Sequence, residues 1–313
     1  MSSLSAIRAA NAAFRHSSAQ PPVAVFVGGT SGIGEGMALT FAEHTKGNSN
    51  IVIVGRNRAA AEKIFASMPA PRSGSDKAAR EFVQCDVSLM KNIQTATKDI
   101  LARYPKINYL VMSPGMLTLS GRDETSEGID KKLALHYYAR WKFAHDLLPA
   151  VQKAKDEGEE GVVMSVLSAG QGGAANLDDL ALKKTYSLAN AALAASTYTD
   201  LMMEAAPNVT FIHGYPGFVR TPLMTTSNTA LIRGLSSVLL PLVRPFSISG
   251  EESSQYMWNA VYNTATKPGV WRTGARGEDL GKKGYSSNES IRDKVWEHTV
   301  QVMKDAMAVP ESQ

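Results

Sequence analysis

The chain has 313 residues, of which 44% are hydrophobic and 20% charged, and its formal net charge is +4. These values are typical of a globular protein, and every apolar run is shorter than the roughly 18–20 residues that cross a bilayer. Acidic and basic residues are interspersed, so the charge pattern does not point to a nucleic acid or a membrane as a partner. The single cysteine, Cys85, excludes an internal disulfide and fits a reducing compartment.

The first twenty residues contain Arg8 and Arg15 but no acidic residue. This composition also suits a mitochondrial transit peptide. Apolar residues recur along the segment at helical spacing, namely Leu4, Ile7, Ala10 and Phe14. We therefore favour a short amphipathic helix packed on the main domain, and a cytoplasmic location.

Short β-branched apolar runs alternate with longer helical patterns from residue 23 onward. The short runs are bounded by turn-forming residues and are typical of buried strands; they cover 23–27, 51–54, 81–84, 109–112, 162–166 and 209–213. The helical patterns cover 34–44, 59–67, 91–104, 129–154 and 187–205. Strands that alternate with helices predict a doubly wound α/β fold of three layers, with a mostly parallel sheet between two layers of helices.

The pattern loosens after Pro216. Residues 222–247 are apolar and contain several prolines, which favours a lid over a pocket. A helix over 251–264, a last strand over 270–272 and a polar helix over 289–307 follow. We expect one Rossmann-type domain over 1–313, divided into an N-terminal extension (1–20), a core (22–224) and a lid (222–250).

The clearest local motif lies where the first strand, 23–27, meets the first long helix. Glycines there let the backbone turn tightly beside a pyrophosphate, and the helix N-terminus offers N–H groups to negative charge. A glycine-rich turn alone is a weak motif, but its place between a strand and a helix predicts a dinucleotide site and makes a purely structural turn the lesser alternative. The residues assigned to this site are Gly28, Thr30, Ser31, Gly32, Ile33 and Gly34.

The second strand ends in Gly55, Arg56 and Asn57. In dinucleotide-binding folds an acid at this position binds the free 2′-hydroxyl of the adenosine ribose, whereas an arginine accommodates a 2′-phosphate. Arg56, with Arg58 nearby and no acid at the strand end, therefore predicts NADP(H) as the cofactor, and Asn57 is assigned to the same site. The alternative is a solvated surface arginine.

With these features, residues 22–224 resemble the short-chain dehydrogenase/reductase family, and especially its fungal members. The resemblance covers the glycine turn and an Asp–apolar pair that holds adenine, here Asp86 and Val87. The family's Asn-Asn-Ala-Gly segment corresponds to residues 112–115, where only the final glycine is kept. The resemblance implies that Ser113 and Gly115 border the cofactor, and that Pro216, Gly217 and Thr221 touch its nicotinamide.

The resemblance also implies a catalytic set of Asn, Ser, Tyr and Lys, of which this chain keeps two. Tyr186 stands at the tyrosine position, and Ser168 stands at the serine position with Ser165 as an alternative. Asn190 replaces the lysine four residues after the tyrosine, and His136 replaces the asparagine. The active site is therefore predicted to be atypical.

The two replacements affect the expected chemistry differently. A free tyrosine has a pKa of about 10, and the family lysine lowers it through its charge. Asn190 can bind a ribose hydroxyl but carries no charge, so alcohol oxidation suffers more than carbonyl reduction, for which a protonated tyrosine suffices. His136 either joins a proton relay or is structural, and Lys183 and Lys184 are expected to be solvated rather than to supply the missing charge.

Three functions follow in order of preference. The first is an NADPH-dependent reductase that acts on the carbonyl of a small or medium apolar molecule, in keeping with fungal family members that tailor secondary metabolites. The second is a non-redox isomerase, dehydratase or cyclase on the same scaffold, and the third is a non-catalytic NADP(H)-binding protein. We expect no metal, because no cluster has ligand spacing. The oligomeric state is left open, since the family often dimerises through helices that correspond to 129–154 and 187–205.

Overall fold

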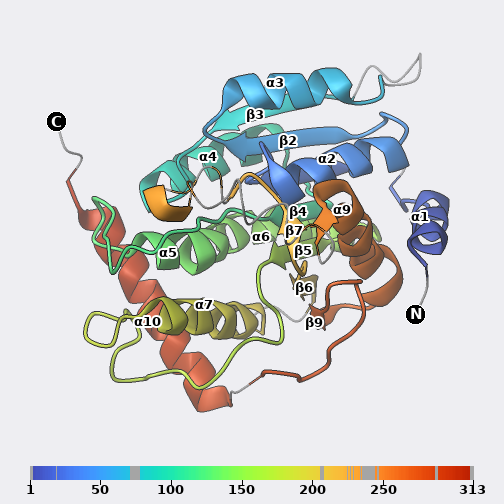
Figure 1. The fold of residues 1–313 in the computed structure, drawn as a ribbon. Coiled ribbons are helices and arrows are strands. Elements are labelled where there is room, and N and C mark those ends of the chain that lie inside the picture. The colour runs from blue at the N-terminus through green and yellow to red at the C-terminus, as the bar shows by residue number, and fades with distance from the viewer. Residues whose placement is uncertain are drawn as a thin grey trace.

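The protein is described by a computed structural model that covers residues 3–18, 20–70, 78–204, 208–223, 225, 227, 229–232, 234, 244, 247–285 and 288–310. Within this part of the chain, seven strands form one parallel sheet in the order β3-β2-β1-β4-β5-β6-β9 (Figure 1). The strands are β1 Val23–Val27, β2 Asn50–Gly55, β3 Arg80–Gln84, β4 Tyr109–Met112, β5 Val162–Val166, β6 Thr210–Gly214 and β9 Gly269–Thr273.

Helices cover both faces of this sheet. One face carries α2 Gly32–His44, α3 Arg58–Ser67 and α9 Gly250–Asn259. The other carries α4 Met90–Arg103, α6 Ala139–Asp156 and α7 Leu188–Met203, with α10 Glu289–Ala308 packed against α4 and α7. All five residues of β1 are buried because successive side chains enter opposite cores, Val25 on one face and Phe26 on the other. The predicted three-layer, doubly wound α/β fold is confirmed.

The order of the strands creates the crevice that holds the candidate site. The chain leaves β1 toward β2 and β3 on one side, whereas β4, β5 and β6 lie on the other. The crossovers on either side of β1 and β4 therefore run in opposite directions and leave a gap at the carboxyl ends of these strands. Ligands of open α/β sheets bind at such a switch point.

The helix expected near the N-terminus is α1, Leu4–Ala13, which packs against α9. Ile7 is buried there, and the Asn11 side-chain amide donates to the Gln255 carbonyl at 2.8 Å. Phe14, directly after the helix, stacks on Tyr262 with ring centroids 4.1 Å apart. Ala10, in contrast, is exposed.

The single helix predicted over 129–154 is instead three segments. A short α5, Lys131–Leu133, passes into the π-helix η1, Ala134–Tyr138, and then into α6. Both tyrosines of the π-turn bind α10, because Tyr137 Oη lies 2.7 Å from Thr299 Oγ1 and Tyr138 Oη lies 2.9 Å from His298 Nε2. Apolar periodicity does not distinguish an α-turn from the wider π-turn, so the prediction of one regular helix was wrong.

The helix predicted over 251–264 is divided in the same way. It consists of α9 followed by the π-helix η3, Ala260–Thr264. The long predicted helix over 187–205 is α7, and residue 205 lies outside the described residues. No helix in the described ranges is long and apolar enough to span a bilayer.

Most of the predicted lid, residues 222–250, lies outside the described residues. The described residues show how the two ends of this segment are connected to the core. A parallel pair of short strands, β7 Val219–Arg220 and β8 Ile248–Ser249, joins these ends. The segment between them therefore leaves and rejoins the core at one place, and its residues Leu223 and Ser227 reach the cavity described below.

Candidate active site

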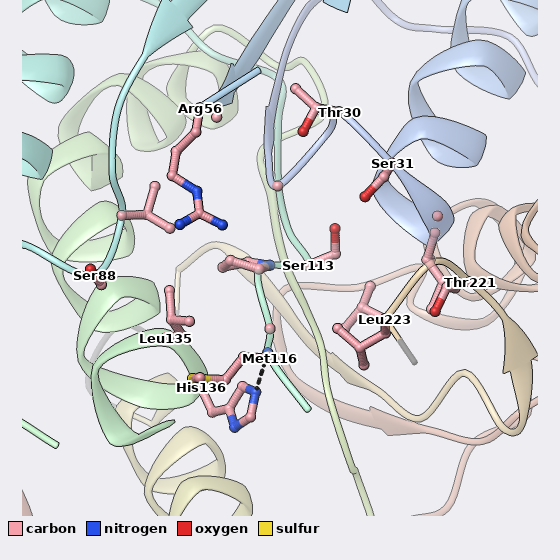
Figure 2. Close-up of a pocket in the computed structure, with 18 of the residues that line it drawn as sticks. Thr30, Ser31, Arg56, Ser88, Ser113, Met116, Leu135, His136, Thr221 and Leu223 are labelled. Carbon is pink, nitrogen blue, oxygen red and sulfur yellow. Dashed lines mark hydrogen bonds between the residues drawn. The ribbon is translucent and has the colours of Figure 1, made fainter. Parts of the chain in front are cut away.

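A cavity of about 620 Å³ opens at the carboxyl ends of β1, β2, β4 and β5, at the switch point of the sheet. Figure 2 shows Arg56 and His136 at opposite ends of it, with Thr30 and Ser31 on one wall. Most residues predicted to bind the cofactor line it, namely Gly28, Thr30, Ser31, Gly32, Ile33, Arg56, Asp86, Val87, Ser113, Gly115, Pro216 and Thr221. The predicted residues Gly34, Asn57 and Gly217 lie outside its lining.

The turn after β1 depends on glycine for its shape. Gly28 has a φ of 79°, and a Cβ added there would lie 2.8 Å from the Pro114 nitrogen. Helix α2 begins at Gly32, and the preceding Ser31 makes no capping bond through its side chain. The backbone N–H groups at the start of α2 therefore have no side-chain cap at Ser31, which suits a phosphate at this turn.

The end of β2 presents Arg56 to the cavity. Its side chain is exposed and extends over the cavity in Figure 2. Arg58 behaves differently, because its guanidinium lies 4.9 Å from the centroid of the Phe82 ring and does not line the cavity. Asn57 caps α3 by accepting the Ala60 N–H at 3.0 Å. Of these three consecutive polar positions, Arg56 is the one available to a ligand.

Beyond β3, the Asp86 carboxylate is held by Ser88. One carboxylate oxygen accepts from the Ser88 N–H at 3.0 Å and from its hydroxyl at 2.7 Å. Asp86, Val87 and Ser88 together form the cavity wall next to Arg56. The pair that sequence comparison assigned to adenine therefore lies beside the arginine assigned to the 2′-phosphate.

Ser113 offers a buried hydroxyl to the same cavity. Its backbone N–H donates to the Val27 carbonyl at 2.9 Å, which fixes it at the end of β4. Its Oγ is buried and has no hydrogen-bond partner among the described residues. A buried hydroxyl without a partner is costly, so this atom is suited to bind a polar group of a ligand.

His136 forms the opposite end of the cavity from within the π-helix η1. Its Nε2 accepts the Met116 N–H at 3.2 Å (Figure 2). Burial lowers the pKa of His136 to about 3, and the charges of Arg140 and Lys132 lower it further in the same direction. The ring is therefore neutral near pH 7, with its proton on Nδ1 and its Nε2 bound to the Met116 N–H.

Arg140, which the sequence did not single out, lies in α6 on the floor of this cavity and is 1% exposed. Its guanidinium donates to the Met112 carbonyl at 3.1 Å, the Val166 carbonyl at 2.9 Å, Ser165 Oγ at 2.7 Å and the Pro114 carbonyl at 2.6 Å. It thereby ties the carboxyl end of β4 to that of β5. Burial lowers the pKa of Arg140 to about 9, so it stays charged at neutral pH. A buried arginine has no sequence signal that separates it from a surface one.

Tyr186 lies directly before α7, partly buried, and does not line the cavity. Its Oη accepts a hydrogen bond from Lys132 Nζ at 2.8 Å. Burial, and next the negative charge of Asp130, raise the pKa of Tyr186 to about 12. The phenol is therefore protonated at neutral pH, and the residue that donates a hydrogen bond to it, Lys132, belongs to α5.

Ser168 and Asn190 also lie outside the cavity wall. The Ser168 N–H donates to His213 Nε2 at 3.2 Å, and the other nitrogen of that ring donates to Asp200 Oδ1 at 2.7 Å. The Asn190 amide donates to the Thr185 carbonyl at 2.6 Å and is exposed. Of the four residues predicted to be catalytic, the structure thus brings only His136 to the cavity, and it joins Tyr186 to Lys132 instead of to position 190.

No group of three or more His, Cys, Asp or Glu side chains in the described part of the chain could hold a metal ion. The polar groups that line the cavity include the guanidinium groups of Arg56 and Arg140, the Lys131 ammonium, hydroxyls, an imidazole and the Asp86 carboxylate. This donor set suits a phosphate-bearing organic ligand.

Comparison with known proteins places this site in a family. Residues 22–231 match the family model "short chain dehydrogenase". The chain is 33% identical to oxidoreductase AN1596 of Emericella nidulans, over 98% of this chain and 99% of that protein. It is 36% identical to oxidoreductase andH of Emericella variicolor, over 82% of this chain and 74% of that protein. The chain therefore belongs to the short-chain dehydrogenase family and is an oxidoreductase of that type.

Solved structures agree at the level of the fold. A 3-ketoacyl-(acyl-carrier-protein) reductase from Brucella melitensis, solved in complex with NADH, superposes with a TM-score of 0.56 at 20% identity. The match covers 85% of this chain and all of that one.

Proposed function

We propose that this protein is an NADPH-dependent reductase that acts on the carbonyl group of a small or medium apolar metabolite. The observation that carries the proposal is the cavity itself, which has a glycine turn and an open helix N-terminus on one wall and Arg56 at one end. A helix N-terminus beside a glycine turn and an arginine at the end of the second strand are the kinds of group that bind the pyrophosphate and the 2′-phosphate of a dinucleotide.

The residues present fit such a cofactor. The turn from Gly28 to Gly34 would hold the pyrophosphate, Arg56 the 2′-phosphate, and Asp86 with Val87 the adenine. The hydroxyl of Ser113 has no partner in the described chain and would bind a sugar or amide oxygen of the ligand. When bound, the nicotinamide would supply a hydride to the carbonyl carbon of the substrate.

The nicotinamide half would lie at the other end of the cavity, near Pro216, Gly217 and Thr221. Pro216 and Thr221 line the cavity, and Figure 2 shows Thr221 on the side away from Arg56, near Ser31. Gly217, with a φ of 71°, gives the backbone a turn that other residues rarely adopt. This assignment follows from the position of Arg56, because the two ends of a dinucleotide cannot share one end of the cavity.

Tyr186 is the proposed proton donor, and Ser168 its partner in binding the carbonyl oxygen. Both lie outside the cavity lining, so this assignment requires the substrate to extend beyond that lining. Reduction needs a protonated acid beside the oxygen that becomes an alcohol, and the raised pKa of Tyr186 keeps the phenol protonated. The lowered pKa of His136 argues against a charged imidazole in this role. The reductive direction is therefore favoured over alcohol oxidation.

The experiment is to follow NADPH consumption by the purified protein with a panel of apolar aldehydes and ketones, alongside Tyr186→Phe. Turnover that falls at least about a hundredfold in the variant supports the proposal, because general acid catalysis contributes about 10²–10⁴-fold. Tight NADPH binding without consumption would instead favour a non-redox or non-catalytic protein. Product formation without net cofactor use would single out an isomerase, dehydratase or cyclase.

Several narrower proposals accompany this one. The resemblance to fungal family members that tailor secondary metabolites leads us to propose a role in secondary metabolism. The apolar side chains Leu117, Leu135, Leu167 and Leu223 of the cavity support an apolar substrate. We also propose that residues 1–313 act as one cofactor-binding domain in the cytoplasm, with a small molecule as the partner.

A further inference from the structure

Lys132 is a buried lysine whose ammonium group contacts the proposed proton donor. It belongs to α5 and is only 8% exposed. Its Nζ donates to Tyr186 Oη at 2.8 Å and to the Ser120 carbonyl at 2.9 Å. The same Nζ lies 5.4 Å from the centroid of the Tyr186 ring.

The neighbouring carboxylate does not take up this ammonium through a salt bridge. Asp130 caps α5, where one of its oxygens accepts the N–H groups of Lys132 and Leu133 at 3.0 and 3.1 Å. Its other oxygen accepts the Asp123 N–H at 3.1 Å. A buried ammonium requires hydrogen-bond acceptors, and here they are the Ser120 carbonyl, the phenol oxygen of Tyr186 and, at 3.5 Å, the Gly121 carbonyl.

Lys132 also connects Tyr186 to the cavity. It precedes His136 by four residues on one continuous helical segment, and its charge contributes to lowering the pKa of His136. His136 lines the cavity and lies away from Arg56 in Figure 2. Lys131, next to Lys132 in the chain, lines the cavity, whereas Lys132 and Tyr186 lie outside the lining.

We propose that Lys132 is the positioning residue of Tyr186 and supplies, from α5, the positive charge that position 190 on α7 lacks. This inference rests on the proposed function, because it assigns to Tyr186 the role of proton donor. Asn190 cannot provide the charge, since it is neutral and its amide is bound to the Thr185 carbonyl.

The chemical consequence concerns the charge left on the tyrosine. When the phenol gives its proton to the product oxygen, the negative charge that remains on Oη lies beside the Lys132 ammonium. Charged groups on both sides affect this step. Asp130 opposes it through its charge and through a hydrogen bond with the Tyr186 phenol, Asp123 opposes it through its charge, and Arg122 assists it. Lys132 is the one that donates a hydrogen bond to Oη itself.

The test compares Lys132→Met with Lys184→Met. Lys184 is the matched control because it is exposed and stands two residues before Tyr186, where its backbone N–H binds Asp179 at 2.8 Å. We expect kcat for carbonyl reduction to fall about tenfold or more in Lys132→Met, as for loss of a charge-assisted hydrogen bond, with the Kd for NADPH within about twofold of the wild type. Lys184→Met should match the wild type.

A rescue experiment separates charge from structure. Lys132→Arg keeps the charge at the same place, and adding Asn190→Lys to Lys132→Met returns a charge from the other helix. We expect each to recover a large part of the lost kcat. Full activity in Lys132→Met, or no recovery in either rescue variant, would overturn the inference.

A second measurement needs neither cofactor nor turnover. Isotope-edited NMR of the tyrosine ring, assigned through Tyr186→Phe, reports the hydrogen bond to Oη at neutral pH. We expect the Tyr186 resonance to move in Lys132→Met but not in Lys184→Met. If the wild type reduces no carbonyl but the Tyr186 resonance moves in Lys132→Met, only the proposed function is refuted. If the resonance does not move in Lys132→Met, the hydrogen bond between Lys132 and Tyr186 is refuted.

Discussion

The most consequential residue that the sequence did not reveal is Arg140. Its guanidinium is buried, and it bonds to acceptors at the ends of β4 and β5, two neighbouring strands whose carboxyl ends border the cavity. The described residues provide it with no carboxylate partner. Replacing it with an apolar side chain would leave several buried carbonyls without donors.

We therefore predict that Arg140→Met lowers the free energy of unfolding by about 2–4 kcal/mol. The free energy of unfolding of Arg140→Lys should lie between those of Arg140→Met and the wild type, because one ammonium group replaces only some of the N–H donors of the guanidinium. Denaturant unfolding at pH 7 measures both. A loss below about 0.5 kcal/mol in Arg140→Met, the range of ordinary surface changes, would contradict the account.

The residues that could be predicted are those whose neighbours in the sequence indicate what they bind. Residues whose role depends on a contact with a distant part of the chain could not be predicted. The glycine turn and Arg56 are recognisable because the strand and helix beside them fix what they can bind. Lys132 and Tyr186 are 54 residues apart in the chain, and their contact depends on how α5 packs beside the start of α7. A charged residue at helical spacing looks solvated until that packing is known.

At the scale of elements, two glycines of helix α2 allow close packing on its two sides: Gly34 against the turn after β1, and Gly36 against α9. A Cβ at Gly34 would lie 2.5 Å from both the Gly28 carbonyl oxygen and Ser113 Oγ. A Cβ at Gly36 would lie 2.6 Å from the Gly250 carbonyl oxygen, at the contact with α9. The same substitution at the two positions therefore disturbs different neighbours of one helix.

Gly34→Ala should weaken NADPH binding by about tenfold or more, since the helix must move away from the turn that we propose to hold the pyrophosphate. Gly36→Ala serves as the matched variant: it should lower stability by about 1–3 kcal/mol, as overpacking does, and leave the Kd of the folded protein within about threefold. Nucleotide titration and thermal unfolding of both variants distinguish the two effects. Equal losses of NADPH affinity in the two variants would contradict the separate roles of Gly34 and Gly36.

The elements themselves were largely predictable. Continuous apolar runs such as Val23–Val27 identify strands buried on both faces, and the observed bounds of the central strands agree with the predicted ones to within about a residue. The breaks in the long helices were not predictable. In η1 the π-turn depends on Tyr137 and Tyr138 reaching α10, a contact with residues about 160 positions away.

At the scale of the whole molecule, buried histidines couple folding to pH. His16, in the N-terminal segment, lies 3.0 Å from the Tyr109 hydroxyl, and burial lowers its pKa to about 4. His136, at the cavity, has its pKa lowered to about 3. Both pKa values lie below the ordinary 6.5, so between them and 6.5 the unfolded chain binds protons that the folded chain does not.

We therefore predict full stability above about pH 6.5 and a progressive loss as the pH falls toward 4. At pH 5 each of these two histidines costs about 2 kcal/mol of unfolding free energy relative to pH 7. Urea unfolding at pH 7, 6 and 5 measures the slope, and His16→Phe should make it less steep. A free energy of unfolding that is unchanged between pH 7 and pH 5 would refute this prediction.

The central claim is that the cavity binds NADP(H) through Arg56. The most direct measurement is a fluorescence titration of the purified protein with NADPH and with NADH, repeated for Arg56→Ala and for Arg58→Ala, whose guanidinium rests on Phe82. We predict a preference for NADPH that falls by about tenfold or more in Arg56→Ala and persists in Arg58→Ala, because only the first loses a charge-assisted contact with the 2′-phosphate. Equal affinity for the two nucleotides in the wild type, or an unchanged preference in Arg56→Ala, would contradict it.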